Sequence, residues 1–253
     1  MRSLPVALMC LAGVSTFADA QPLADRVRST KNGAVTFEFT AREGVCGDGS
    51  TFIKYGSSYM GRFSSSTRRA RCDAGPVQVR LSLVDGDVDR VESWVGTPRT
   101  RDAKDLGAVP AREAARYLLD IAAHSNSGAS KAILPAVLAD SAVVWPTLLT
   151  IARDNRRSSN TRGDASFWLS RFAAAATSGH PNEPFDDEDP DERDDLKAHA
   201  VFVLSQLPHN EGIPMLYDVA RKNPDPHVRS KALFWLGQSG DARALDLFES
   251  ILR

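Results

Sequence analysis

The sequence predicts an α+β protein, in which a mainly α-helical repeat solenoid follows a small N-terminal antiparallel β domain. Two patterns predict this fold. In the C-terminal part, similar segments recur with apolar residues at helical spacing, whereas between residues 33 and 96 apolar and polar residues alternate. A chain of 253 residues is long enough to build two modest domains of this kind.

Residues 1–20 have the composition of a secretory signal peptide. Arg2 precedes an apolar run from Leu4 to Val14, and Ala18-Asp-Ala20 stands directly before Gln21. We therefore expect cleavage after this motif and export to the periplasm or the extracellular space. No other apolar run approaches the ~18 residues of a membrane span.

Removal of this peptide would leave two of the three cysteines, Cys46 and Cys72. In an oxidising compartment an even pair is most simply a disulfide. A metal site is disfavoured because this part of the chain contains no histidine. A disulfide that closes a loop of this length stabilises a domain by roughly 3 kcal/mol.

Residues 21–97 are expected to form the small β domain. The apolar residues of Val35–Phe39 alternate with polar ones, as in a half-buried strand, and Thr51–Tyr55 is a second candidate strand. The same alternation returns in Val77–Leu83. Asp85-Gly86 then predicts a hairpin turn into the following strand.

Residues 98–109 are polar and predict a linker, after which the helical region runs from 110 to 253. Pro110 suits the first turn of a helix, where its missing N–H costs nothing. Residues 183–195 contain nine acidic residues and one arginine. They lack the spacing of a calcium-binding loop, so we interpret them as an acidic insertion between repeats.

Three segments of the helical region superpose: Ala165-Ser-Phe-Trp-Leu-Ser-Arg, Ala200-Val-Phe-Val-Leu-Ser-Gln and Ala232-Leu-Phe-Trp-Leu-Gly-Gln. The alanines of these three windows lie 35 and then 32 residues apart, and a weaker fourth copy begins at Ala132. Each window predicts the second helix of a helical pair. Because each pair buries only one face against its neighbours, stacking stabilises the array. We therefore expect Leu204, in the middle window, to be buried.

The helices that precede the windows also repeat. Trp145–Arg153 superposes on Ile213–Arg221, with proline at the second position of both. A unit of about 33 residues built in this way resembles the short bacterial HEAT repeats related to those of phycobilisome lyases, most clearly over Asp225–Asp241. The resemblance covers roughly residues 110–253, and the whole chain is similar to exported bacterial HEAT-repeat proteins with a small N-terminal β region. Lyase chemistry is not implied, since the repeat region has no cysteine.

In HEAT arrays the second helices line the concave surface, so the resemblance implies a polar column where equivalent positions of these helices meet. The candidate partner-binding residues at two such positions are Arg162, Asp164, Lys197, His199, Arg229 and Lys231. In the alternative interpretation, the basic residues pair with acids of neighbouring turns, such as Asp154 and Asp225, and join the repeats. Exposed pairs of that kind contribute only about 0–1 kcal/mol each.

Catalytic motifs such as Gly-x-Ser-x-Gly, His-Glu-x-x-His or a phosphate loop are absent from the sequence. We therefore expect a non-enzymatic extracytoplasmic scaffold or binding protein, without a cofactor, that uses its repeats to hold a protein or peptide. Alternatively, the β domain binds a small ligand or an envelope polymer and the helices support it. Export and a net charge of −1 argue against nucleic acid as a partner.

Overall fold

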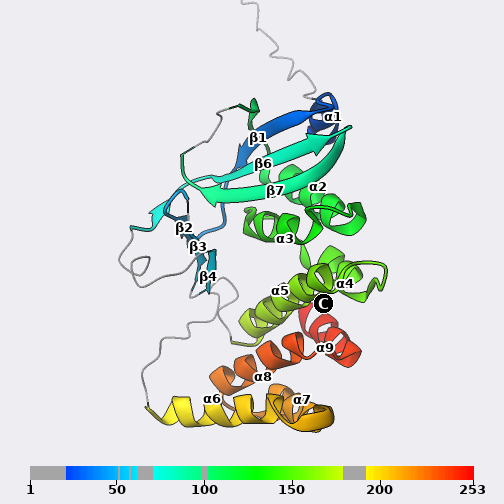
Figure 1. Ribbon diagram of the computed structural model, residues 1–253. Coiled ribbons are helices and arrows are strands. Elements are labelled where there is room, and N and C mark those ends of the chain that lie inside the picture. Colours follow the sequence, from blue (N-terminus) through cyan, green and yellow to red (C-terminus); the bar gives the residue numbers. More distant parts are fainter. Residues whose placement is uncertain (1–20, 51, 57, 62–70, 98–101, 179–191) are drawn as a thin grey trace, which may run out of the picture.

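The computed structural model describes residues 21–50, 52–56, 58–61, 71–97, 102–178 and 192–253. The predicted signal peptide and residues 183–191 of the predicted acidic insertion lie outside these ranges. Figure 1 shows the larger sheet at one end of the molecule, the smaller sheet at the side of the upper helices, and further layers of helices stacked below. The predicted combination of a mainly helical part with an N-terminal β region is confirmed.

The larger sheet consists of β1 (Gly33–Phe39), β6 (Val77–Val84), β7 (Asp87–Val95) and β8 (Lys104–Ala108). Its strand order is β7-β6-β1-β8, with β1 antiparallel to β6 and parallel to β8. The apolar residues of the predicted alternation are buried in both strands, from Val35 to Phe39 in β1 and from Val77 to Leu83 in β6. Ala34, Thr36 and Gln78 are buried as well, so the alternation of burial is incomplete. The predicted Asp85-Gly86 turn joins β6 to β7.

Two elements near this sheet differ from the prediction. The segment 98–109, which the sequence predicts as a linker, contains β8, and the helix α1 (Leu23–Arg28) precedes the first strand. Leu106 is the buried residue of β8, whereas α1 buries Leu23 and Val27. With only one or two buried residues, such short elements show no periodicity, and their position depends on contacts with distant parts of the chain.

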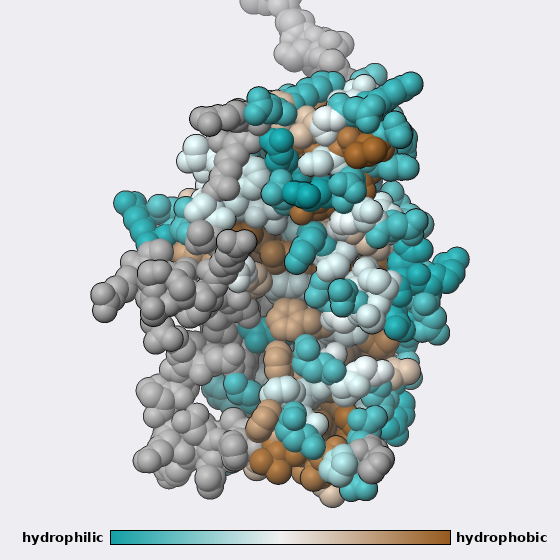
Figure 2. All heavy atoms as spheres, in the orientation of Figure 1, coloured by the Kyte–Doolittle hydropathy of each residue, from teal (hydrophilic) through white to brown (hydrophobic). Residues whose placement is uncertain are grey.

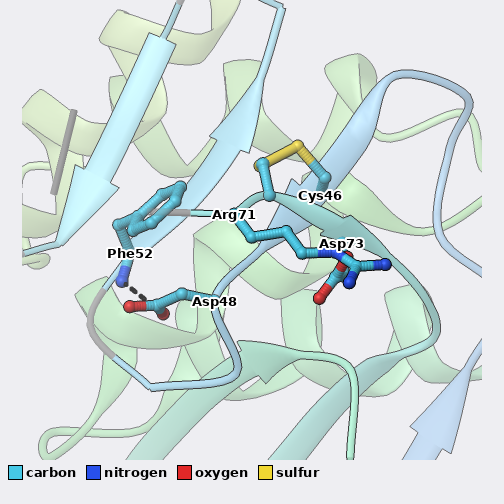
Figure 3. The surroundings of a disulfide bond; sticks show 6 residues. Cys46, Asp48, Phe52, Arg71 and Asp73 are labelled. Atoms are coloured by element: carbon cyan, nitrogen blue, oxygen red, sulfur yellow. Dashed lines mark hydrogen bonds and ion pairs between the residues drawn. A yellow bond between two sulfur atoms is a disulfide. The ribbon is translucent and has the colours of Figure 1, made fainter. Parts of the chain in front are cut away.

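The smaller sheet consists of β2 (Val45–Gly47), β3 (Phe52–Tyr55), β4 (Ser58–Gly61) and β5 (Asp73–Ala74), in the order β4-β3-β2-β5. The sequence predicts one sheet, and the structure has two. The predicted disulfide is present and joins Cys46 of β2 to Cys72, which directly precedes β5, with 5.2 Å between the Cα atoms. In the adjacent turn, Asp48 accepts a hydrogen bond from the Phe52 N–H (Figure 3).

The helical part comprises α2 (Ala111–His124), α3 (Ala129–Leu138), α4 (Trp145–Arg153), α5 (Ser159–Ser178), α6 (Glu192–Ser205), α7 (Ile213–Lys222), α8 (Pro226–Gln238) and α9 (Ala242–Leu252). The three windows lie in α5, α6 and α8, so each forms a helix as predicted. The side chains of Asp225 and Asp241 cap α8 and α9 by accepting hydrogen bonds from backbone N–H groups.

The helices do not stack in chain order. The main partner of α5 is α8, and the two helices run antiparallel. At one end the Arg229 guanidinium donates to the Thr177 carbonyl oxygen (2.8 Å), and at the other Gly237 lies against Ser170. The helix α9 returns beside α4, where Arg153 forms an ion pair with Glu249 (2.8 Å). The layers therefore follow the order α2/α3, α4/α5, α8/α9 and α6/α7 (Figure 1).

Leu204 shows the consequence of this order. We expect it to be buried because its window is the middle one in the sequence, but α6 belongs to the end layer and Leu204 is only partly buried. The equivalent Leu169 and Leu236 lie in inner layers and are 0% and 1% exposed. Position in the stack, rather than position in the repeat, decides the burial.

Sheets and helices share one hydrophobic core. Val91 and Val95 of β7 belong to the same buried cluster as Ile133 of α3. The segment between β1 and β2 is also tied to α3, because the Arg42 Nε–H donates to the Val137 carbonyl oxygen (2.8 Å). The β region and the helical region are thus distinct in sequence but packed as one body.

Candidate functional site

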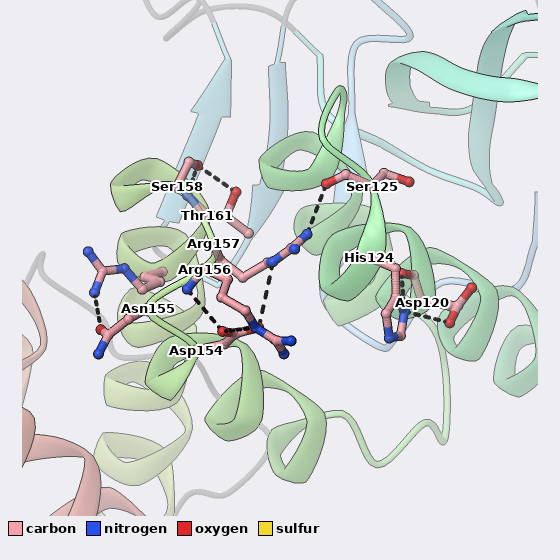
Figure 4. Close-up of polar contacts among 10 residues, drawn as sticks. Asp120, His124, Ser125, Asp154, Asn155, Arg156, Arg157, Ser158 and Thr161 are labelled. Carbon is pink, nitrogen blue, oxygen red and sulfur yellow. Dashed lines mark hydrogen bonds and ion pairs between the residues drawn. The ribbon is translucent and has the colours of Figure 1, made fainter.

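Arg162, one of the six predicted binding residues, lies in the first turn of α5 and bonds to the turn between α4 and α5. Its guanidinium donates to the Asn155 Oδ1 (2.8 Å). The same turn contacts α2, because Arg157 approaches Asp154 and donates to the Ser125 carbonyl oxygen (3.2 Å; Figure 4). The turn thus uses its polar groups to join two layers.

Lys197 and Arg229 also join helices. The Lys197 ammonium group forms an ion pair with Asp225 (3.0 Å), which links α6 to the cap of α8. The hydrogen bond from Lys197 lowers the pKa of Asp225. Arg229 donates to the carbonyl oxygens of Asn223 (2.9 Å) and Thr177 (2.8 Å). For Lys197 the geometry matches the alternative interpretation, in which basic residues pair with acids of neighbouring turns. Arg229 also joins helices, but through backbone carbonyl oxygens.

The predicted binding residues whose side chains the structure describes do not form one column. Asp164, near the start of α5, accepts a hydrogen bond from the Ser130 hydroxyl of α3. Arg229 contacts Thr177 near the end of α5, and the intervening turns of helix span about 20 Å. Lys231 follows Arg229 on α8, and the His199 side chain lies outside the described part of the structure. Equivalent positions do not align because α5 and α8 run antiparallel.

A groove of about 480 Å³ lies where the two sheets meet α3 and α5. One wall comes from β7, the opposite wall from β3 and β4, and the floor from α3 and α5. The lining is mainly apolar, with charged side chains from three elements. The residues used below are Met60, Glu92, Ser93, Lys131, Leu134, Asp164 and Phe167. Asp164 is therefore the one predicted binding residue among those that line this groove.

Aromatic rings lead out of the groove along the second helices. Phe167 of α5 contacts Phe234 of α8 with 6.2 Å between ring centroids. The ring centroid of Phe234 lies 5.1 Å from that of Trp235, and the ring centroid of Trp235 lies 5.2 Å from that of Phe202 of α6. We call these four residues the aromatic row. In Figure 2 apolar residues extend from the middle of this face to its lower end, over α5, α8 and α6.

Burial distinguishes the aromatic row from the core. Phe167, Phe234 and Trp235 are partly buried, and Phe202 is 38% exposed. The sequence contains a signal for this row, because phenylalanine stands at the third position of all three windows. From sequence, each window predicts a second helix without distinguishing this position, which the structure leaves partly or more fully exposed in all three helices.

The groove and the row have the character of a binding surface. Within the described ranges, no group of three or more histidine, cysteine or acidic side chains could hold a metal ion. None of the described helices combines the length and the apolar character that crossing a membrane requires. An apolar seat with charged groups at its edge can bind the side chains of another molecule without covalent chemistry.

A family model of HEAT repeats matches residues 187–253. This range includes α6, α7, α8 and α9, so the HEAT-repeat character predicted from the windows is confirmed there. No curated protein and no solved structure matches the chain. HEAT repeats commonly serve as protein-interaction modules, and the aromatic row lies on the three helices that contain the repeated windows.

Proposed function

We propose that this protein is a non-enzymatic extracytoplasmic scaffold that holds a protein or peptide partner against its HEAT-like repeats. One observation carries the proposal: the aromatic row begins inside the groove and crosses three second helices. Aromatic residues are enriched in protein interfaces, where they bury a large area at a low entropic cost.

The dimensions of the surface support a partner larger than a small molecule. The groove alone has the volume of a small-ligand site, which is typically about 300–1,000 Å³. The aromatic row extends this surface over α8 to α6 in the end layer. A side chain of the partner in the groove and further contacts along the row would together give an interface with an apolar centre and a polar rim.

The proposed location rests on the predicted signal peptide and on the disulfide, which persists in oxidising compartments. Exported protein should begin at Gln21 and contain the Cys46–Cys72 bond. Intact-mass measurement tests both features at once, and a retained signal peptide or two free thiols would contradict this location.

A second candidate function remains, in which the β region binds a small ligand or an envelope polymer. It is supported by the contribution of β3, β4 and β7 to the walls of the groove. The two candidates differ in what they require of α8, because only a protein or peptide partner needs the row beyond Phe167.

The deciding experiment is affinity capture from an envelope fraction with three variants of the mature protein. Phe167→Ala alters the groove, and Phe234→Ala alters the row. Val143→Ala is the matched control, since this residue is 76% exposed and lies beside α2 and α4 instead. We expect the first two variants to lose at least about tenfold in captured partner, with unchanged circular dichroism. Loss with Phe167→Ala alone would favour the small-ligand function, and no loss with either variant would contradict both.

A further inference from the structure

Both strands at the mouth of the groove are edge strands. β7 ends the larger sheet and β4 ends the smaller one. On β7, the Gly96 N–H donates to the Pro76 carbonyl oxygen, and the same register continues along the strand. Hydrogen-bonded pairs alternate in an antiparallel ladder. The backbone N–H and C=O groups of Val91, Ser93 and Val95 therefore point away from β6.

Within the described residues, the segment before α3 and the end of β2 cover this free edge at two places and leave it open between them. Gly128, before α3, lies so close to Val91 that an added Cβ atom would be 3.0 Å from the Val91 Cγ2. A Cβ atom added to Gly47 would likewise be 3.1 Å from the Val95 Cβ. Ser93 stands between these contacts and lines the groove. In the part of the chain that the structure describes, the outward backbone groups of Ser93 bond to no other residue.

An apolar seat lies in the same groove as this open edge. Leu134 and Phe167 are partly buried residues of the helical floor, and Met60 is a partly buried residue of the opposite strand. Successive side chains of an extended chain point to opposite sides. A segment paired with Ser93 can therefore direct one apolar side chain toward this seat and turn its neighbours outward.

The charged residues at the groove indicate which groups would surround the outward-pointing side chains of the bound segment. Lys131 of α3 and Asp164 of α5 carry opposite charges, and Glu92 of β7 interacts with Arg80 (3.8 Å). Such a mixed rim suits polar side chains of either sign and does not select a strongly charged partner. The complementary segment is thus an extended peptide in which apolar and polar residues alternate.

We propose that the partner of the scaffold binds as an added β-strand, paired with the open edge of β7 at Ser93 and with an apolar side chain seated against Leu134 and Phe167. This inference rests on the proposed function and specifies the conformation and chemistry of the bound segment. Strand addition to an exposed edge is an established mode of peptide recognition, in which backbone hydrogen bonds give affinity and alternate side chains give specificity.

The probe is a phage-displayed library of random dodecapeptides, selected on the mature disulfide-bonded protein. The peptides with the highest affinity are synthesised and their Kd is measured by fluorescence anisotropy. Each is then N-methylated at one backbone amide at a time. Methylation removes a donor without changing the side chain, so it tests pairing without a risk to the fold of the protein.

We expect the effect of methylation on the Kd to alternate from one amide of the peptide to the next. Methylation of an amide that faces Ser93 should weaken binding at least about tenfold, whereas methylation of the two neighbouring amides should change the Kd less than about twofold. On the protein, Ser93→Pro should have the same effect, because it removes the outward N–H at an edge position where proline is tolerated. Ser93→Ala is the matched control, since it retains that N–H and should bind normally.

Failure of strand addition can be distinguished from failure of the scaffold function. Equal effects of methylation at all positions, or equal binding by Ser93→Pro, would overturn strand addition. Selection that enriches no peptide would overturn it as well. In either case the scaffold function stands if capture of the partner still depends on Phe167 and Phe234, and it falls if capture does not.

Discussion

Asp154 organises the turn between α4 and α5 through contacts that require an ionised carboxylate. Its oxygens accept from the Arg156 side chain (2.9 Å) and from the Arg156 backbone N–H (3.0 Å), and Arg157 lies 3.7 Å away. The hydrogen bond from the Arg156 side chain is the main reason why the pKa of Asp154 is lowered from 3.8 to about 2. The turn that positions the first residues of α5 therefore depends on a charge.

This environment predicts the pH dependence of the turn. The pKa of Asp154 is lower in the folded protein than in the unfolded chain. Its stabilising contribution is therefore complete above pH 3.8 and is lost as the pH falls toward about 2. A carboxyl titration followed by NMR should show the Asp154 transition near 2, moving up toward 3.8 in Arg156→Ala. A transition near 3.8 in the unsubstituted protein would contradict this account of the turn.

Gly237 permits the close approach of α8 to α5. A Cβ atom at this position would lie 2.6 Å from the Ser170 Cβ and 3.2 Å from the Ser166 carbonyl oxygen. Such distances require one helix to move. In contrast, a Cβ atom at Gly163, on the exposed side of α5, would meet no atom within 4 Å.

These two glycines form a matched pair for mutation. Gly237→Ala should lower the free energy of unfolding by about 1–3 kcal/mol, because it overpacks the interface. Gly163→Ala should raise it by about 0.5–1 kcal/mol, because alanine favours the helix and nothing obstructs it. Urea unfolding of both variants measures the two values. Destabilisation of similar size in both would show that α5 and α8 do not approach as closely as described.

At the scale of the elements, the distinctive feature is the return of α9 into the stack. It packs against α4 and α5, although α6 and α7 lie between α5 and α9 in the sequence. Phe248 of α9 is fully buried. Arg153 of α4 forms ion pairs with Asp246 and Glu249, which both belong to α9. The last helix of the chain is therefore an inner element of the array.

Substitutions in α9 should therefore lower the free energy of unfolding more than substitutions in α6. Phe248→Ala should cost about 3–5 kcal/mol, because it leaves a cavity between inner layers. Amide hydrogen exchange should then increase in α4, α5 and α8 as well as in α9. Leu204→Ala should cost less than about 2 kcal/mol and affect α6 and α7 only, since this residue is partly exposed in the end layer. The reverse ranking would support stacking in chain order.

The helices could be predicted from sequence because their signals are local. Pro146 and Pro214 mark helix starts, and Asp225 and Asp241 cap the helices that follow them. The order of the layers could not be predicted, because it depends on which helical faces meet over long distances in the chain. The predicted polar column failed to assemble for this reason. The disulfide required no such knowledge, since the two cysteines that remain after the predicted cleavage allow only one pairing.

At the scale of the whole molecule, one core connects the sheets to the helices. The larger sheet packs on α3, and the chain between β1 and β2 bonds to the end of that helix through Arg42. The sequence predicts the fold class but does not show that the β region and the helices share a core, because the apolar residues of a strand indicate a buried face and not the element that covers it. The groove arises at this same junction. It therefore could not be located from either region alone.

The shared core predicts a single cooperative unfolding transition. Urea curves followed by far-UV circular dichroism, which reports mainly on the helices, should coincide with curves from near-UV circular dichroism of the aromatic residues. Reduction of the disulfide should shift both curves together, by roughly 3 kcal/mol. Two separate transitions would indicate that the β region and the helices fold independently.

The central claim is that a partner lies in the groove at the start of the aromatic row. Site-specific photo-crosslinking in the producing cell tests it most directly, with a benzophenone amino acid in place of Phe167 or, as a control, of Val143 on another face. We predict that a discrete covalent adduct with a protein or peptide forms from position 167 and not from position 143. Adducts from position 143 alone, or equal adducts from both positions, would contradict the claim.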